Sequence, residues 1–186
     1  MKLPIIGYGH ALLRRVAEPV TADYPELEKL IEDMYETMCA ASGVGLAAPQ
    51  VNRSIRLFVV DAGPFGETYP EAKDFKRTFI NPKILETRGD AWRFNEGCLS
   101  VPHINEDVLR PAEVKMEYQN ENFEEKEEWF SGICARIIQH EYDHLEGKMF
   151  VDRISNLKRT LLKRKLNDII NGKIHTDYKF IPAKRR

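Results

Sequence analysis

Two histidines four residues apart, His140 and His144, carry the clearest chemistry in the sequence. On a helix, side chains at positions i and i+4 leave the same face about one turn apart, so both imidazoles can reach one metal ion. The intervening residues complete an H-E-x-x-H pattern, in which a glutamate beside the metal handles protons. Two histidines on an ordinary amphipathic helix are the alternative. The chain has only five histidines and places Glu141 between these two, which favours the metal site.

A third ligand must come from elsewhere, because two side chains do not hold a metal stably. The longer zinc-protease pattern, H-E-x-x-H-x-x-G-x-x-H, is followed as far as Gly147 but fails at Phe150, which cannot bind metal. A distant glutamate remains open on the sequence alone. Cys98, in the stretch E-G-C-L-S, is the better candidate, since a thiolate is a strong ligand and Gly97 would let the backbone approach the metal closely.

A third stretch, G-V-G-L-A-A-P-Q at residues 43–50, follows the first expected helix. Its small residues leave backbone N–H and C=O groups accessible to an extended ligand, and Gln50 adds a side-chain amide. Taken alone, a helix end followed by a turn explains these residues as well.

Together the stretches G-V-G-L-A-A-P-Q, E-G-C-L-S and Q-H-E-Y-D-H-L-E-G, in this order, resemble the three signature motifs of peptide deformylases, across residues 43–147. The resemblance implies removal of the formyl group from the N-terminal formylmethionine of newly made proteins, with release of formate. It also implies that Cys98, His140 and His144 bind the metal and that water takes the fourth position. Three protein ligands and one open position are typical of catalytic rather than structural sites.

The resemblance also implies roles for the remaining motif residues. Helix geometry places Glu141 and Asp143 on opposite flanks of the histidine face and does not choose between them. The longer glutamate side chain and the family motif favour Glu141 as the proton carrier, and we expect Asp143 to pair with Arg110. The Gln50 side chain and the Leu99 backbone N–H are the expected donors to the oxygen that becomes negative during attack.

The methionine side chain of a substrate needs an apolar pocket, and a peptide backbone can add to an accessible strand. Phe94 lies before the second motif, and two isoleucines lie one and two turns before the metal histidines. The predicted substrate-binding residues are Val44, Gly45, Phe94, Gly97, Ile133 and Ile137.

A thiolate with two imidazoles suits zinc, iron(II), nickel or cobalt, and ligand type does not select among them. The resemblance favours iron(II) in the cell, one divalent ion per chain.

Periodicity predicts the elements that position these residues. Apolar spacing indicates a helix in 25–43, a second in 131–147 that carries the histidines, and a third in 154–172 with one apolar stripe. Runs at 56–62, 77–89 with a break at Pro82, 112–118 and 125–131 indicate strands, and their short connections indicate antiparallel pairing. We therefore expect an α+β fold with antiparallel strands packed around the central metal-binding helix, an N-terminal helix and a C-terminal amphipathic helix.

The length of 186 residues fits one catalytic domain over 1–186, with a basic helix and tail from about residue 155. From Ser155 onward there are ten basic and two acidic residues, a charge of +8, so with a total of −1 residues 1–154 carry −9. Such a tail could contact ribosomal RNA, or simply be the solvated face of a helix.

Composition shows no membrane span or export signal and gives no reason to expect DNA as a partner, so we expect a cytoplasmic protein. Cys39 and Cys134 are expected to be small buried groups, because an odd, sparse set of cysteines argues against disulfides. A general metallopeptidase is the rival enzyme class. Cys98 counts against it, since the commoner H-E-x-x-H proteases use an acidic residue or a third histidine as the remaining ligand.

Overall fold

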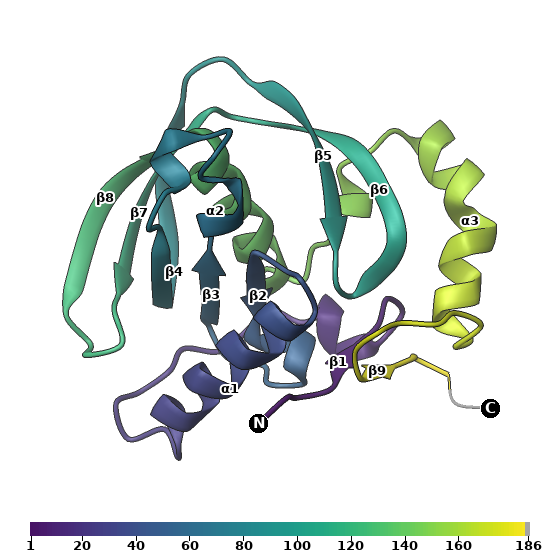
Figure 1. Ribbon diagram of the computed structural model, residues 1–186, viewed down its shortest axis with the longest axis horizontal. Helices are drawn as coiled ribbons and strands as arrows, with labels where there is room; N and C mark the ends of the chain where they lie inside the picture. Colours follow the sequence, from purple (N-terminus) through teal and green to yellow (C-terminus); the bar gives the residue numbers. More distant parts are fainter. Residues whose placement is uncertain (185–186) are drawn as a thin grey trace.

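The computed structural model describes residues 1–184 and combines helices with mostly antiparallel strands (Figure 1), which confirms the predicted α+β class. Arg185 and Arg186, which belong to the predicted basic tail, lie outside the described residues. In the described chain, no helix has the length and apolar character needed to cross a bilayer. The helices are α1 (Leu27–Ala40), α2 (Gly132–Leu145) and α3 (Asn156–Ile170). The strands are β1 (Ile5–Ile6), β2 (Gly45–Ala47), β3 (Leu57–Asp61), β4 (Lys76–Arg88), β5 (Trp92–Cys98), β6 (Val101–Arg110), β7 (Glu113–Gln119), β8 (Glu125–Ser131) and β9 (Phe180–Ile181).

A five-stranded sheet, in the order β2-β3-β4-β7-β8, is antiparallel throughout. Successive side chains of a strand point to opposite faces. In β3, Phe58 and Val60 therefore pack in the core cluster that contains α2, while Leu57 and Val59 pack in the cluster that contains α1. The sheet is thus covered by α2 on one face and by α1 on the other.

Helix α2 is buried along almost its whole length and lies between the five-stranded sheet and the β5–β6 hairpin (Figure 1). Gly132, with φ +56°, is its first residue, and Glu71 Oε1 accepts a hydrogen bond from the Ile133 N–H at 3.2 Å. Gly147, with φ +67°, follows its end, as the sequence predicts. A helix covered on all sides is a rigid support for functional side chains.

The β5–β6 hairpin is an element that the sequence did not reveal. Asn95 and Asp107 face each other on its exposed side, and its buried side includes the charged residues Glu96 and Arg110, which interrupt the apolar half of the strand pattern. The expected break at Pro82 is a shift of register inside the single strand β4, between Ile80 and Lys83.

Two further expectations are wrong. The predicted stripe of α3 does not exist as one face, because Leu157 and Leu161 are 71% and 74% exposed while Leu166 and Ile169 are buried. At 3.6 residues per turn, each residue of the first pair lies about 80–180° around the axis from each residue of the second pair, so one packed surface does not cover both. Cys39 is exposed near the end of α1, whereas Cys134 is buried as expected.

Candidate metal centre

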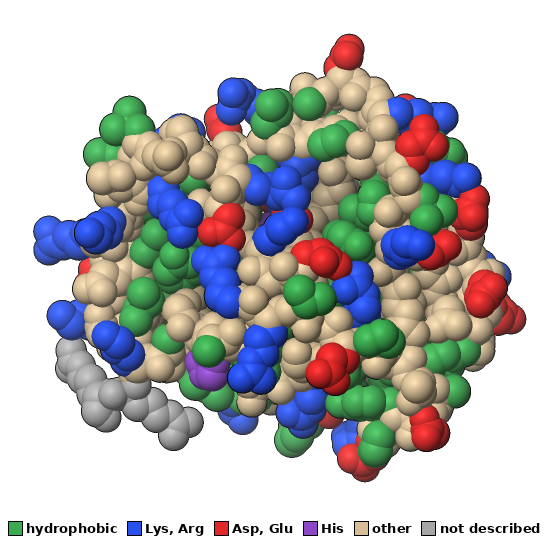
Figure 2. All heavy atoms as spheres, turned by 180° about the vertical axis from the view of Figure 1, so that it is seen from behind, with side chains coloured by type: hydrophobic (Ala, Val, Ile, Leu, Met, Phe, Trp, Pro, Cys, Tyr) green, Lys and Arg blue, Asp and Glu red, His purple; other side chains and the backbone are tan. Residues whose placement is uncertain are grey.

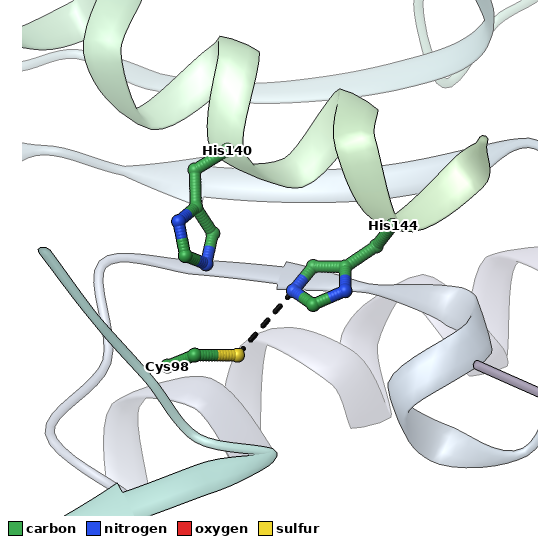
Figure 3. Close-up of side chains that lie close together, drawn as sticks. All are labelled: Cys98, His140 and His144. Atoms are coloured by element: carbon green, nitrogen blue, oxygen red, sulfur yellow. Dashed lines mark hydrogen bonds between the residues drawn. The ribbon is translucent and has the colours of Figure 1, made fainter. Parts of the chain in front are cut away.

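The structure brings Cys98, His140 and His144 together (Figure 3). Cys98 is the last residue of β5, and both histidines project from α2. One ligand atom from each residue lies within 4.8 Å of the other two, and Cys98 Sγ is 3.4 Å from His144 Nε2. Residues 42 positions apart in the sequence thus converge because the hairpin packs along α2.

The donor set fits a single divalent ion. Tetrahedral bonds of about 2.0–2.3 Å to nitrogen and sulfur separate neighbouring ligand atoms by about 3.3–3.8 Å, which agrees with the measured sulfur–nitrogen distance. Burial lowers the pKa of His144 to about 3, so its ring is neutral and has a lone pair to offer. One sulfur and two imidazole nitrogens suit borderline-soft divalent cations.

Glu96 orients His140, a role that the sequence reasoning missed. Glu96 Oε2 lies 2.9 Å from His140 Nδ1. An ionised carboxylate only accepts, so Nδ1 donates and the other ring nitrogen, which faces the cluster in Figure 3, keeps its lone pair for a metal. Glu96 and Cys98 are two residues apart in β5 and so point to the same face, which is the signal that could have identified Glu96.

Buried arginines keep Glu96 ionised. Arg110 Nε and Arg136 Nη1 donate to Glu96 Oε1 at 2.7 and 2.8 Å. Burial alone would raise the pKa of Glu96, but the hydrogen bonds from His140 and Arg110 hold it well below its usual range. Arg110 Nη1 also donates to Asp143 Oδ2 at 2.7 Å, which confirms the predicted pair. Arg153 donates to the same carboxylate at 2.5 Å. Asp143 therefore contacts two arginines, and its side chain makes no hydrogen bond to either histidine.

Glu141 is buried and lines the cavity described below. Its burial raises the pKa of the carboxyl to about 7. Within the described chain, Glu141 Oε2 has no hydrogen-bond partner. A β-carbon on Gly45 would lie 2.3 Å from Glu141 Oε1, so only glycine leaves room for the carboxylate in this position.

Gln50 extends from the 3-10 turn Ala48–Val51 toward the cluster. Its Oε1 accepts a hydrogen bond from the Ala47 N–H at 2.9 Å, which fixes the orientation of the amide. Its Nε2 then faces the metal site, 3.2 Å from Ser100 Oγ and 3.5 Å from Cys98 Sγ. Ser100, which was not among the predicted site residues, helps to place this donor.

A cavity of about 620 Å³ opens beside the cluster. Its wall includes most of the predicted substrate residues, namely Val44, Gly45, Phe94, Gly97 and Ile137, together with Gln50, Cys98, Leu99, His140 and Glu141. Ile133, which is also on α2, is instead fully buried in the core between this helix and the sheet. Sequence reasoning missed Phe65 and Arg136, which also line the cavity. A β-carbon on Gly97 would lie 2.7 Å from the side-chain nitrogen of Asn105 on the facing strand.

A cysteine sulfur and two histidine rings that converge beside a cavity, with a buried glutamate next to them, define a metal-dependent hydrolase. A family model described as polypeptide deformylase matches residues 2–160. The peptide deformylase of Flavobacterium psychrophilum is 50% identical, over 100% of both chains. That of Flavobacterium johnsoniae is 52% identical, over 100% of this chain and 99% of the other. The crystal structure of a peptide deformylase from Legionella pneumophila has a TM-score of 0.79 and 37% identity, over 90% of this chain and 95% of that one. The chain belongs to the peptide deformylase family, and its activity is removal of the N-formyl group from nascent chains.

Proposed function

We propose that the chain releases formate from formyl-methionyl nascent peptides at a centre where Cys98, His140 and His144 hold one divalent metal ion. The observation that carries this proposal is the convergence of the three ligand atoms within 4.8 Å, at the wall of a cavity that also exposes Glu141 and Gln50. A divalent ion held by three protein ligands supplies Lewis acidity, which brings the pKa of a water ligand toward about 7 and polarises a carbonyl.

Glu141 is the proton carrier of this proposal. Its carboxylate lies next to His140 in the chain and has an oxygen without a partner among the described residues. It accepts a proton from the attacking water and delivers it to the departing amine. Asp143 is engaged by Arg110 and Arg153 and is not available for this role.

Gln50 Nε2 and the Leu99 N–H are the donors to the formyl oxygen as it becomes negative. The contacts of Gln50 to Ala47 and Ser100 hold its amide before the substrate arrives, which is the arrangement that stabilises a developing charge most effectively.

The substrate backbone lies along β2, which is the outer strand of the five-stranded sheet. An edge strand offers unpaired N–H and C=O groups to an extended peptide. The Val44 carbonyl accepts a hydrogen bond from the Asp61 N–H, so Gly45 is the residue whose backbone pairs with the residues after the methionine, with Val44 beside it and Gly97 on the opposite wall. Phe94 and Ile137 surround the methionine side chain, and Ile133 supports this pocket from the core.

Iron(II) is the proposed metal in the cell, with zinc, nickel and cobalt as possible replacements. Metal analysis of protein purified without oxygen, with the activity of each reconstituted form, tests this choice. Zinc alone in an active preparation would contradict it.

The purified protein is expected to release formate from a formyl-Met-Ala-Ser peptide and to leave the acetylated peptide of the same sequence unchanged. Both peptides present the same methionine side chain to the cavity. The acetyl group differs from the formyl group by a methyl on the reacting carbonyl carbon, and this methyl would crowd the space beside Glu141. A formate assay with mass spectrometry of both peptides checks this. Cleavage of an internal peptide bond would indicate a general metallopeptidase instead.

We further propose that residues 1–186 act as one catalytic domain in the cytoplasm, where translation supplies the substrate, and that the basic region from about 155 contacts the ribosome. In Figure 2, Lys and Arg side chains gather with hydrophobic ones on the side of α3. Leu157 and Leu161 are exposed, as are Lys163, Arg164 and Lys165. Basic side chains around exposed leucines suit a partner with both phosphates and protein, such as a ribosomal surface.

Reversal of three charges on α3, in the variant K163E/R164E/K165E, is expected to weaken ribosome binding and to reduce its salt dependence, because fewer counterions are released. Formate release from free peptides should not change. Co-sedimentation with ribosomes at several salt concentrations measures the effect. The control variant K2E/R53E/K73E makes the same charge change at exposed positions outside α3. Equal binding by both variants would contradict the docking proposal.

A further inference from the structure

The segment after α3, residues 173–184, returns to the core of the molecule and is called the C-terminal strap. Its strand β9 pairs in parallel with β1, with Ile5 opposite Phe180 (Figure 1). The N–H groups of Ile5 and Gly7 donate to the carbonyls of Lys179 and Ile181 at 2.8 and 2.9 Å. The strap is therefore held in place by backbone hydrogen bonds to the other end of the chain.

The strap also reaches the substrate cavity. Thr176, Asp177 and Tyr178 line its wall, and His103 Nε2 lies 2.6 Å from the carbonyl oxygen of His175. Tyr178 is half-buried, and its hydroxyl donates to the carbonyl oxygen of Leu99 at 2.7 Å. The Thr176 hydroxyl donates to the Tyr178 carbonyl at 2.8 Å, which fixes the backbone on which the phenol is mounted.

The hydrogen bond from Tyr178 reaches Leu99 within the connection between β5 and β6, which carries several of the proposed site groups. The connection from Cys98 to Val101 carries a proposed metal ligand, a proposed backbone donor and the Ser100 hydroxyl that meets Gln50. The register of the β5–β6 ladder shifts between Gly97 and Cys98, and Leu99 and Ser100 have no partner in it. Contacts from outside the hairpin therefore help to fix their orientation. The Tyr8 N–H holds the Ser100 carbonyl at 2.8 Å, and Tyr178 holds the Leu99 carbonyl.

We propose that Tyr178 is a positioning residue for the deformylation reaction, whose hydroxyl holds the Leu99 carbonyl and thereby directs the Leu99 N–H at the formyl oxygen. The inference rests on the proposed role of Leu99 as an oxyanion donor. The Leu99 N–H and C=O lie on the two peptide planes that meet at its Cα, so fixing the carbonyl limits rotation of the N–H. A donor contributes to rate only when it is aimed before the charge develops, so a Leu99 backbone that rotates more freely would slow the chemical step and leave binding intact.

The phenol is suited to this task at any physiological pH. Burial, and after it the charge of Cys98, raises the pKa of the Tyr178 hydroxyl above its usual value, so the group keeps its proton and remains a donor. The Leu99 carbonyl is the acceptor, so the contact acts through the backbone and not on the reacting atoms.

The test is Tyr178→Phe, which deletes one oxygen. We expect kcat to fall about 10-fold, less than the roughly 10²–10³-fold loss when an oxyanion donor is deleted, with KM changed by less than about 2-fold. Metal content should stay that of the wild type. In the zinc-loaded, ¹⁵N-labelled protein the Leu99 amide should exchange its hydrogen faster, a readout that does not depend on activity. Tyr118→Phe is the matched control, because the Tyr118 hydroxyl makes a bond of the same 2.7 Å length, to Glu128, outside the cavity wall.

The outcomes separate this inference from the proposed function. Formate release by the wild type, with a loss of about 10²–10³-fold in Gln50→Ala, supports the oxyanion arrangement. Wild-type kcat in Tyr178→Phe would then overturn the positioning role alone. So would a rise in KM at constant kcat, or equal losses in both tyrosine variants together with lower melting temperatures. Full activity in Gln50→Ala would overturn the oxyanion arrangement and the role of Tyr178 with it.

Discussion

Replacement of Glu141 by glutamine is expected to lower kcat about 10²–10⁴-fold, the usual contribution of a general acid–base group, while the metal content stays unchanged. Glutamine has the shape of glutamate, so it fits against Gly45, where a β-carbon would lie only 2.3 Å from the carboxylate. It cannot accept a proton from water. Formate release under saturating substrate and metal analysis of the same preparation measure both quantities.

Glu146→Gln is the control for this substitution. Glu146 follows α2 directly and forms an ion pair with Arg56 at 2.8 Å, so the same chemical change occurs just beyond the same helix without touching the cavity. Its kcat should equal that of the wild type. If Glu141→Gln kept wild-type kcat, the proton would be carried by another group, and the proposed mechanism would be wrong.

Loss of one ligand is expected to have the other large effect. Cys98→Ala should bind little metal and lose more than about 10⁴-fold in activity, because the Lewis acid that generates the nucleophile is gone. The fold should persist, since Cys98 is only partly buried at the end of a strand. The melting temperature of this variant should no longer rise when metal is added. In the wild type, metal at 100 times its dissociation constant should raise the free energy of unfolding by about 2.7 kcal/mol, and the melting temperature with it.

Cys39→Ala is the control for Cys98→Ala, because it removes a thiol that is not a proposed metal ligand. Cys39 is exposed on α1 and is not part of the cluster, so this variant should keep its metal, its activity and its response to added metal. Wild-type metal content in Cys98→Ala would mean that another residue supplies the third ligand.

Local periodicity was enough to predict the elements that support the site. The predicted strand 56–62 is observed as Leu57–Asp61, and the histidine helix ends before Gly147 as expected. Such predictions succeed because the spacing of apolar residues reflects one buried face. They failed for β5 and β6, whose buried face includes the charged residues Glu96 and Arg110, and for α3, whose leucines belong to two different faces.

The partners of the metal ligands could not be predicted in the same way. Glu96 contacts Arg110, Arg136 and His140, which are 14, 40 and 44 residues away, so the contacts depend on how the hairpin packs on α2. The same limit applies to Ile133 and Ile137. Both share the helix face of the histidines, but only the position of the sheet determines that Ile133 faces the core while Ile137 reaches the cavity.

The buried charges that join β5, β6 and α2 have a consequence for how the enzyme opens and closes locally. Arg110 bridges Glu96 and Asp143, so detachment of the hairpin from α2 would break several buried ion pairs at once. Removing one partner of a buried pair costs about 3–5 kcal/mol, which is a large part of the stability of a small protein. We therefore expect the hairpin to stay attached to α2 during local fluctuations of the folded chain. A newly made copy of this enzyme would then complete its ligand set only when the hairpin docks on α2.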